Sequence, residues 1–226
     1  MEGPEICSSS FGAFLEVEKR PGKRDGKQVG TDMSDGIPEN HPLRQLFSRA
    51  LDKAFQEHGD LYSPGVASHL GDDVLCDFIH VDRIFRLKDS SGQRLEDLAR
   101  MLHVATEREG PERRIEVDSY IGAFALFMSG FFPGSLAARR WLAPNPMVSK
   151  VGPIFVSFER PLDYYEAEGR NAYGRAAETA RLFAPDVRET YTRLAEKFPE
   201  YLELVKLVKT LISDDPEVKQ AGRLLD

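Results

Sequence analysis

Few residues of this chain have the types and spacing that metal or cofactor chemistry needs. The five histidines include none in an H-E-x-x-H pattern, and they stand at positions 41, 58, 69, 80 and 103. A helical di-metal site uses a Glu-x-x-His pair twice. The sequence offers one weak approximation, Asp77 to His80, and no second copy. We therefore expect no metal site and no bound cofactor, and we interpret His80 as a residue near a helix end.

Nucleophilic catalysis is no better supported by the sequence. There is no G-x-S-x-G turn and no glycine-rich loop that would hold a phosphate. Cys76 lies in an apolar helical pattern, where a small buried cysteine is the usual case. Cys7 has no neighbours that would activate it. We assign no catalytic residue and favour a protein that is not an enzyme.

A tyrosine-rich stretch over 161–182 is the best remaining candidate for a site. It brings aromatic rings and charged side chains within a few helical turns, and a pocket between it and the helix predicted over 117–132 could bind a small molecule. The predicted pocket residues are Tyr120, Phe124, Tyr165, Glu168, Arg170 and Tyr173. In the alternative interpretation the tyrosines line the core and form hydrogen bonds at its rim.

The element that must position these residues is the apolar run over 117–132, VDSYIGAFALFMSGFF. Charged residues stop at Asp118 and return only at Arg139. Glycine and serine dilute the run and Pro133 ends it, so we interpret it as the central buried helix and not as a membrane span. Small residues at Gly122 and Gly169 predict close packing of this helix against the tyrosine-rich one.

The remaining periodicity predicts an all-α fold, a multi-helix bundle in one domain over 41–226. Helix starts are expected at Asn40-His41-Pro42 and Ser63-Pro64. Further helices are expected over 94–108, after Pro133, and over 186–197, 200–212 and 216–225. Residues 1–40 are expected to form an irregular arm. A proline-rich insertion over 142–160 contains an alternating stretch that predicts a short strand over 154–158, and 11–17 could form another.

The arm and the insertion are the expected contact surfaces for another protein chain. The stretch over 19–27 is locally basic, and the insertion carries apolar side chains that are typical of interface anchors. The predicted interface residues are Lys19, Arg20, Lys23, Arg24, Trp141, Met147, Ile154, Phe155 and Phe158. In the alternative, the basic stretch is a solvated loop and the insertion folds back over the core of its own domain.

Composition narrows the class of partner. The formal charge of -7 disfavours nucleic acid, because phosphate contacts need a basic face. The first residues lack a basic start and a long apolar core, so we expect no signal peptide, and two cysteines fit a reducing cytoplasm. We expect a non-enzymatic interaction module, a subunit or adaptor of a protein assembly. The alternative is a small-molecule-binding protein or an enzyme that uses the predicted pocket.

Three pieces of sequence together resemble a family of bacterial helical proteins with no assigned activity. They are RLEDLARML over 94–102, IGAFALFMSGFFP over 121–133, and the pattern of Tyr165, Gly169, Arg170 and Tyr173. The resemblance covers roughly 43–179 and implies an all-helical fold and a bacterial source, with no mechanism. Acidic residues are frequent in that family at two positions that are Ala123 and Ala167 here.

The central helix generates the first prediction. Phe124→Ala should lower the free energy of unfolding by about 3–5 kcal/mol, because it empties a core aromatic site. Urea denaturation measures this loss. A loss below about 1 kcal/mol would show that Phe124 lies outside the core.

Overall fold

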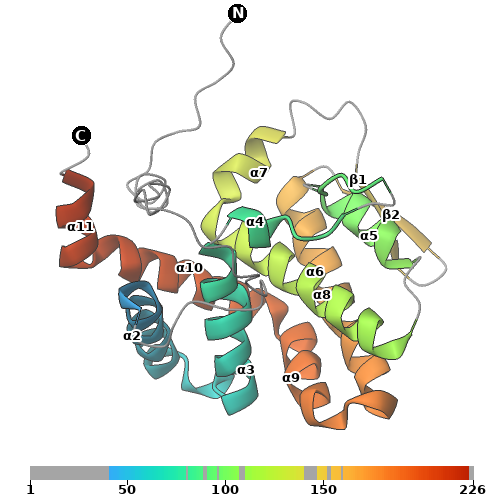
Figure 1. Ribbon diagram of the computed structural model, residues 1–226, viewed down its shortest axis with the longest axis horizontal. Helices are drawn as coiled ribbons and strands as arrows, with labels where there is room; N and C mark the ends of the chain where they lie inside the picture. Colours follow the sequence, from blue (N-terminus) through green and yellow to red (C-terminus); the bar gives the residue numbers. More distant parts are fainter. Residues whose placement is uncertain are drawn as a thin grey trace, which may run out of the picture.

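A computed structural model describes residues 41–223 of the chain, apart from 80, 89–90, 96, 107–109, 140–146, 152–153 and 159. In this part the protein is an all-α multi-helix bundle with one two-stranded β-hairpin (Figure 1). The main α-helices are α2 (Pro42–Glu57), α3 (Pro64–Ser68), α5 (Leu98–Thr106), α6 (Pro111–Phe131), α7 (Pro133–Arg139), α8 (Pro161–Phe183), α9 (Pro185–Glu196), α10 (Phe198–Asp214) and α11 (Pro216–Arg223). Shorter elements are the 3-10 turns Gly59–Leu61 and Asp77–Ile79, the π-helix His69–Cys76, and α4 (Val81–Ile84).

Proline marks the first turn of most of these helices. A proline at this position is tolerated because its missing N–H would have no intrahelical partner there. Side-chain caps complete several starts. The Nδ1 atom of His41 accepts the Leu43 N–H at 3.2 Å, and the Ser63 hydroxyl accepts the Val66 N–H at 3.3 Å. The cap of α2 is therefore His41, one residue after Asn40, which the sequence pattern had indicated as the cap.

The central helix α6 is buried along most of its length, as predicted. Every residue from Val117 to Phe131 is buried, and α8, α10, α5 and the π-helix all contact it. Phe124 has no exposed surface and Phe127 is 3 % exposed. α6 extends back to Pro111, one and a half turns before the predicted start. The residue before it is Gly110, whose positive φ of 85° is not helical and so sets the start of the helix.

α8 is the closest neighbour of α6, and glycine makes this approach possible. A Cβ placed on Gly169 would lie 2.8 Å from the Ala125 Cβ and 2.6 Å from the Phe198 ring. One placed on Gly122 would lie 2.8 Å from three atoms of the Tyr173 ring. The two helices thus pack at a distance that a methyl group would not allow at either position.

Two predicted helices differ from the observed elements. The single helix expected to start at Ser63-Pro64 is divided into α3, a π-helix and a 3-10 turn. Its buried residues include the pairs His69-Leu70 and Val74-Leu75, which recur after five residues. Five residues separate hydrogen-bonded partners in a π-helix, so this conformation turns both pairs towards the core.

The helix expected from Arg94 begins four residues later, at Leu98. The Asp97 carboxylate accepts the Ala99 N–H at 2.8 Å and so caps the helix there. Arg94 instead forms an isolated β-bridge with Lys88.

The predicted strand over 154–158 is present and pairs with a second strand. β1 (Met147–Val151) and β2 (Ile154–Phe158) form an antiparallel hairpin, with Met147 opposite Phe158 and Val151 opposite Ile154. Both strands lie against α8, as Figure 1 shows. The backbone of the insertion therefore lies beside its own domain.

Close packing of α6 on α8 gives a prediction. Gly169→Ala should destabilise the protein by about 1–3 kcal/mol, because the added methyl group meets Ala125 and Phe198. Gly174→Ala on the same helix is the matched control, because a Cβ there meets nothing within 4 Å. Thermal and urea denaturation compare the two variants. Equal stability of both variants would contradict the packing described here.

Candidate functional site

The α8–α9 helical hairpin carries an open groove and a group of exposed apolar side chains. Only Ala184 separates the two helices, and the turn lies at the lower edge of the molecule in Figure 1. On its inner side α8 presents small residues, Ala172, Ala176 and Ala180, to the rest of the domain. In α9 only Leu194 is fully buried. Most of α9 therefore faces solvent, and its position depends on the polar contacts beneath it.

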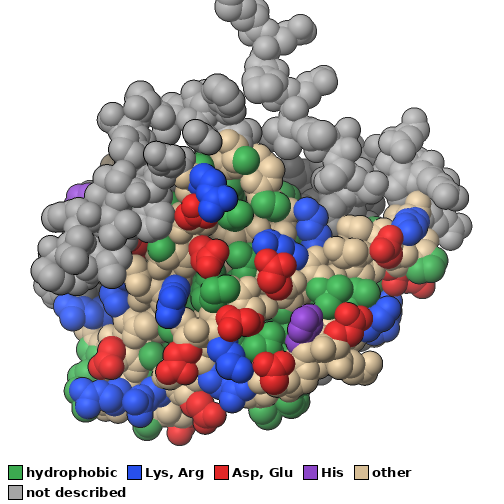
Figure 2. Space-filling model, turned by 180° about the vertical axis from the view of Figure 1, so that it is seen from behind, with side chains coloured by type: hydrophobic (Ala, Val, Ile, Leu, Met, Phe, Trp, Pro, Cys, Tyr) green, Lys and Arg blue, Asp and Glu red, His purple; other side chains and the backbone are tan. Residues whose placement is uncertain are grey.

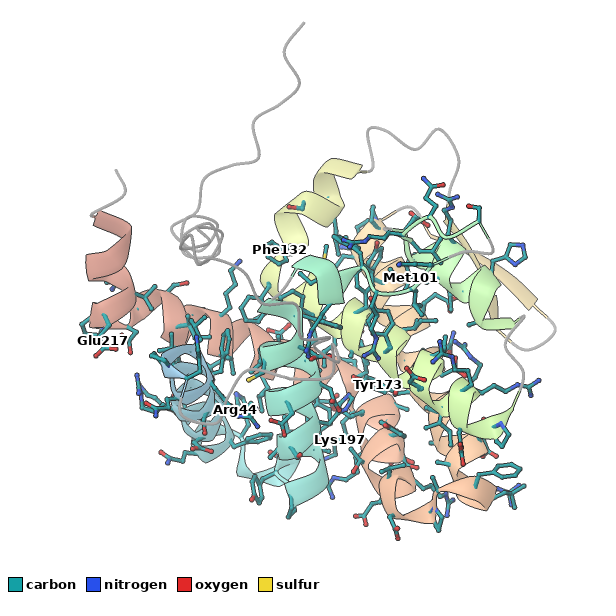
Figure 3. All side chains as sticks on the ribbon, in the orientation of Figure 1. Arg44, Met101, Phe132, Tyr173, Lys197 and Glu217 are labelled. Atoms are coloured by element: carbon teal, nitrogen blue, oxygen red, sulfur yellow. The ribbon has the colours of Figure 1, made fainter. Side chains whose placement is uncertain are left out.

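A chain of hydrogen bonds connects the π-helix to α8. His69 is 6 % exposed, and its Nδ1 atom lies 2.7 Å from Asp73 Oδ2. Its Nε2 atom lies 2.9 Å from the Tyr173 hydroxyl oxygen. Tyr173 has no exposed surface and lies in the interior of the bundle (Figure 3). The imidazole therefore joins a carboxylate at the surface to a phenol in the core.

The protonation of this chain follows from its surroundings. Burial raises the pKa of Tyr173 well above its ordinary value, so the phenol remains protonated. Burial opposes ionisation of Asp73 as well, but the hydrogen bond and charge of His69 outweigh it and lower the pKa of Asp73. With a proton on Nδ1, the His69 ring donates to the Asp73 carboxylate, and its Nε2 atom accepts the Tyr173 O–H. Because Tyr173 is fully enclosed, its oxygen does not meet a substrate from solvent, and the chain of hydrogen bonds fixes the π-helix to α8.

Tyr191 attaches α9 to the same cluster. Its ring stacks on Tyr173 with centroids 6.1 Å apart and meets His69 edge-on at 5.7 Å. Burial raises the pKa of Tyr191, while a hydrogen bond with Ser119 of α6 lowers it in part. α9 is thereby held to α6 and to the π-helix through one side chain.

One ion pair crosses from α6 to the outer side of α8. Arg175 Nε and Nη2 both lie 2.8 Å from Asp118 Oδ1. Burial raises the pKa of Asp118, and the charge and hydrogen bond of Arg175 oppose that rise. The pair fixes the Arg175 guanidinium at the edge of the α8–α9 surface.

Beside this ion pair an open groove of about 760 Å³ lies between α8 and α9. Arginine, amide and hydroxyl groups alternate along it with small residues, and its lining is Arg170, Asn171, Gly174, Arg175, Ala177, Glu178, Arg188, Thr192, Ala195 and Glu196. In Figure 2 basic side chains gather at the lower left, the end of the molecule that carries the α8–α9 turn.

An exposed apolar cluster lies at that turn. Four large apolar side chains of the described chain are exposed, and three of them fall within six residues. Leu182 is 69 % exposed, Phe183 58 % and Val187 37 %. We call these three residues the apolar tip. The fourth is Tyr62, at 53 %.

The residues of the sequence-predicted pocket are divided between the core and the groove. Tyr120, Phe124 and Tyr165 are buried in one series of aromatic contacts, with centroids 6.4 Å and 6.2 Å apart. Tyr173 lies with His69, as described above. Arg170 is exposed and lines the groove. Of the six residues, Arg170 lines the groove, and the other five are buried.

Two of these residues have a defined polar environment in the core. The Tyr120 hydroxyl donates to the Ile84 carbonyl at 2.5 Å, and the Arg86 guanidinium lies 4.4 Å from the ring centroid. Burial raises the pKa of Tyr120 to about 12. Glu168 is 5 % exposed. The pKa of Tyr164 is raised mainly by the burial of Tyr164 and next by the negative charge of Glu168.

The sequence-predicted interface residues fall mostly where the structure gives no side-chain environment. Lys19, Arg20, Lys23, Arg24 and Trp141 lie outside the described residues. Met147, Ile154, Phe155 and Phe158 lie in β1 and β2, whose backbone pairing is described above. Their part in an interface stays a prediction.

Sequence reasoning missed the His69 chain and the apolar tip. His69 and Asp73 are four residues apart, a spacing that brings two side chains together on a helix. No metal-binding pattern includes His69, and the distant partner Tyr173 has no local signal in the sequence. In the described residues no group of three metal-ligating side chains comes together. None of the described helices combines the length and the apolar character that a membrane crossing requires.

Comparison with known proteins adds no relative. No protein-family model matches the chain, and no match was found among curated proteins or solved structures. The all-helical fold implied by the sequence resemblance is nevertheless the fold observed.

The buried hydrogen-bond chain gives a prediction. Tyr173→Phe should lower the free energy of unfolding by about 1–3 kcal/mol, because His69 Nε2 is left buried without its donor. Tyr62→Phe is the matched control, since Tyr62 is 53 % exposed. Urea denaturation at neutral pH measures both variants. Loss of no more than a few tenths of a kcal/mol for Tyr173→Phe would show that the bond adds nothing to stability.

Proposed function

We propose that this chain is a non-enzymatic protein-interaction module, a subunit or adaptor of a larger assembly, and that it docks its partner through the apolar tip. The observation that carries this proposal is the clustering of Leu182, Phe183 and Val187 at one turn. Single exposed apolar residues are normal on a protein surface, whereas contiguous apolar surface marks interaction sites.

Backbone hydrogen bonds order the turn that carries the tip. The Ala184 N–H donates to the Ala180 carbonyl at 2.9 Å, and the Val187 N–H donates to the Ala184 carbonyl at 3.3 Å. Pro185 starts α9 directly after the turn. A preorganised anchor loses less conformational freedom on binding, so more of the contact free energy is retained as affinity.

Burial of the tip would supply a substantial driving force. Covering a leucine or phenylalanine side chain contributes about 1.5–3 kcal/mol for each residue. Charged side chains border the tip, among them Arg181, which pairs with Glu178 at 3.5 Å. An apolar centre with a polar rim is the usual anatomy of a protein interface.

The alternative, a small-molecule-binding protein or an enzyme, needs space between α6 and α8. Gly169 meets Ala125 and Phe198 closely there, and Gly122 meets Tyr173. The groove at α8 opens instead towards α9. Nothing in the described residues favours the alternative over docking at the surface.

Affinity capture from the source cells tests the proposal. Wild-type protein, Leu182→Ser/Phe183→Ser and the control Tyr62→Ser are compared, with bound proteins identified by mass spectrometry. The expected result is one set of partners retained by wild type and by Tyr62→Ser and reduced at least about tenfold by the double variant, since interface anchors dominate affinity. Melting temperatures confirm that all three proteins are folded.

A further variant separates the tip from the insertion. Residues 143–156 are replaced by a Gly/Ser linker in otherwise full-length chain. Partner recovery that survives the tip variant and is lost with the shortened insertion would place the interface at the β-hairpin and overturn docking through the tip.

A further inference from the structure

We infer that the groove between α8 and α9 binds an acidic segment of a partner protein, with carboxylates on Arg170 and Arg188 and an apolar side chain against Leu182. This inference rests on the proposed function, because it names the chemistry of the partner that docks beside the apolar tip. Positive charge remains unbalanced along the groove.

Two of the three arginines in the groove are available to a ligand. Arg175 is committed to Asp118, with both contacts at 2.8 Å. Within the described part of the chain, Arg170 and Arg188 form no ion pair, and both side chains are exposed. Two uncommitted guanidinium groups on facing helices therefore line one recess.

The carboxylates of the groove do not cancel this charge. Glu178 is paired with Arg181 at 3.5 Å, which leaves Glu196 as the lining carboxylate without a described partner. The two positive charges of Arg170 and Arg188 therefore exceed the one negative charge of Glu196 by one. Asn171 and Thr192 add an amide and a hydroxyl group that can donate to a ligand.

The floor of the groove has room for a bound segment. Gly174, Ala177 and Ala195 contribute little side-chain volume, and a Cβ added to Gly174 meets nothing within 4 Å. Leu182 follows Glu178 by four residues on the same helix, so it continues the face of α8 that lines the groove. The groove and the apolar tip thus form one continuous surface.

Carboxylate is the anion that this surface suits best. A guanidinium group presents a planar pair of N–H donors that matches a carboxylate or a phosphate. A nucleic-acid backbone needs a continuous basic track, whereas this groove also carries Glu178 and Glu196 and the chain has a formal charge of -7. Leu182 favours a ligand that also has an apolar side chain. An acidic amphipathic peptide satisfies both conditions.

The length of the ligand follows from the helix geometry. From Arg170 to Leu182 the surface extends about 18 Å along α8, at 1.5 Å for each residue. A helical peptide of about 12–14 residues spans this distance. Its acidic residues would meet the two arginines, and a leucine on the adjoining face would meet the tip.

Fluorescence anisotropy on the full chain tests the inference. The probes are fluorescein-labelled amphipathic peptides of about 14 residues in which leucine recurs at helical spacing and the polar face is glutamate. Matched peptides carry lysine in place of glutamate, and a single-stranded oligothymidylate is the third probe. We expect the glutamate peptides to bind and the lysine peptides and the oligonucleotide to bind at least about tenfold more weakly, with affinity that falls as salt rises.

Charge-reversal variants locate the binding. Arg170→Glu/Arg188→Glu should weaken the glutamate peptides at least about tenfold, because two guanidinium contacts become repulsive. Arg49→Glu/Lys53→Glu is the control, since it makes the same change in net charge on α2, which does not line the groove. It should bind like wild type within about twofold. Melting temperatures verify that both variants are folded.

Several results would overturn the inference. Equal binding of glutamate and lysine peptides, or equal loss in both double variants, would exclude recognition of carboxylates by this groove. Tighter binding of the oligonucleotide would show that the arginines bind phosphate groups. Self-association that the groove variant abolishes would assign them to a second copy of this chain. Peptide binding only after removal of residues 1–40 would assign them to the arm of the same chain.

Failure of this inference is distinguishable from failure of the proposed function. If Leu182→Ser/Phe183→Ser abolishes partner capture while Arg170→Glu/Arg188→Glu leaves it unchanged, docking at the tip stands and the acidic-segment inference falls. If the tip variant has no effect on capture, the proposed function itself falls.

Discussion

The close approach of α6 and α8 is the constraint on which the rest of the structure depends. A methyl group at Gly122 or Gly169 would already be in steric conflict, with Tyr173 in one case and with Ala125 and Phe198 in the other. Because the helices lie this close, Tyr173 reaches across to His69 and Arg175 reaches Asp118. The Tyr173–His69 hydrogen bond and the Arg175–Asp118 ion pair therefore both depend on glycine at positions 122 and 169.

The parts of the fold that sequence could predict are those with a local physical signal. The apolar run that ends at Pro133 defined α6, and proline after a capping residue located the starts of α2 and α3. Alternation over 154–158 indicated β2. Its partner β1, MVSKV, contains Ser149 and Lys150 and has no clear alternation of apolar residues, so the hairpin itself was not apparent.

The parts that sequence could not predict depend on contacts between distant residues. The apolar residues around His69 and Leu70 are compatible with an α-helix and with a π-helix. Packing against α2 and α6 favours the π-helix, in which residues five apart face the core. Tyr173 was predicted to line a pocket, and the structure buries it completely in the core. Its partner His69 lies 104 residues earlier, and no pattern within either helix connects them. The exposure of the apolar tip could not be predicted either, because Leu182 and Phe183 continue the sequence of α8 without a distinct pattern.

Several contacts hold α9 in place although only one of its residues is fully buried. Arg193 donates to the Asp60 carbonyl at 3.3 Å and to the Tyr62 carbonyl at 3.4 Å. Tyr191 of the same helix stacks on Tyr173. Each such contact contributes about 1 kcal/mol or less at an exposed site, but together they restrict the helix in several directions. α9 is thus positioned by polar and aromatic contacts on its inner side, which leaves its outer side and the groove free for a ligand.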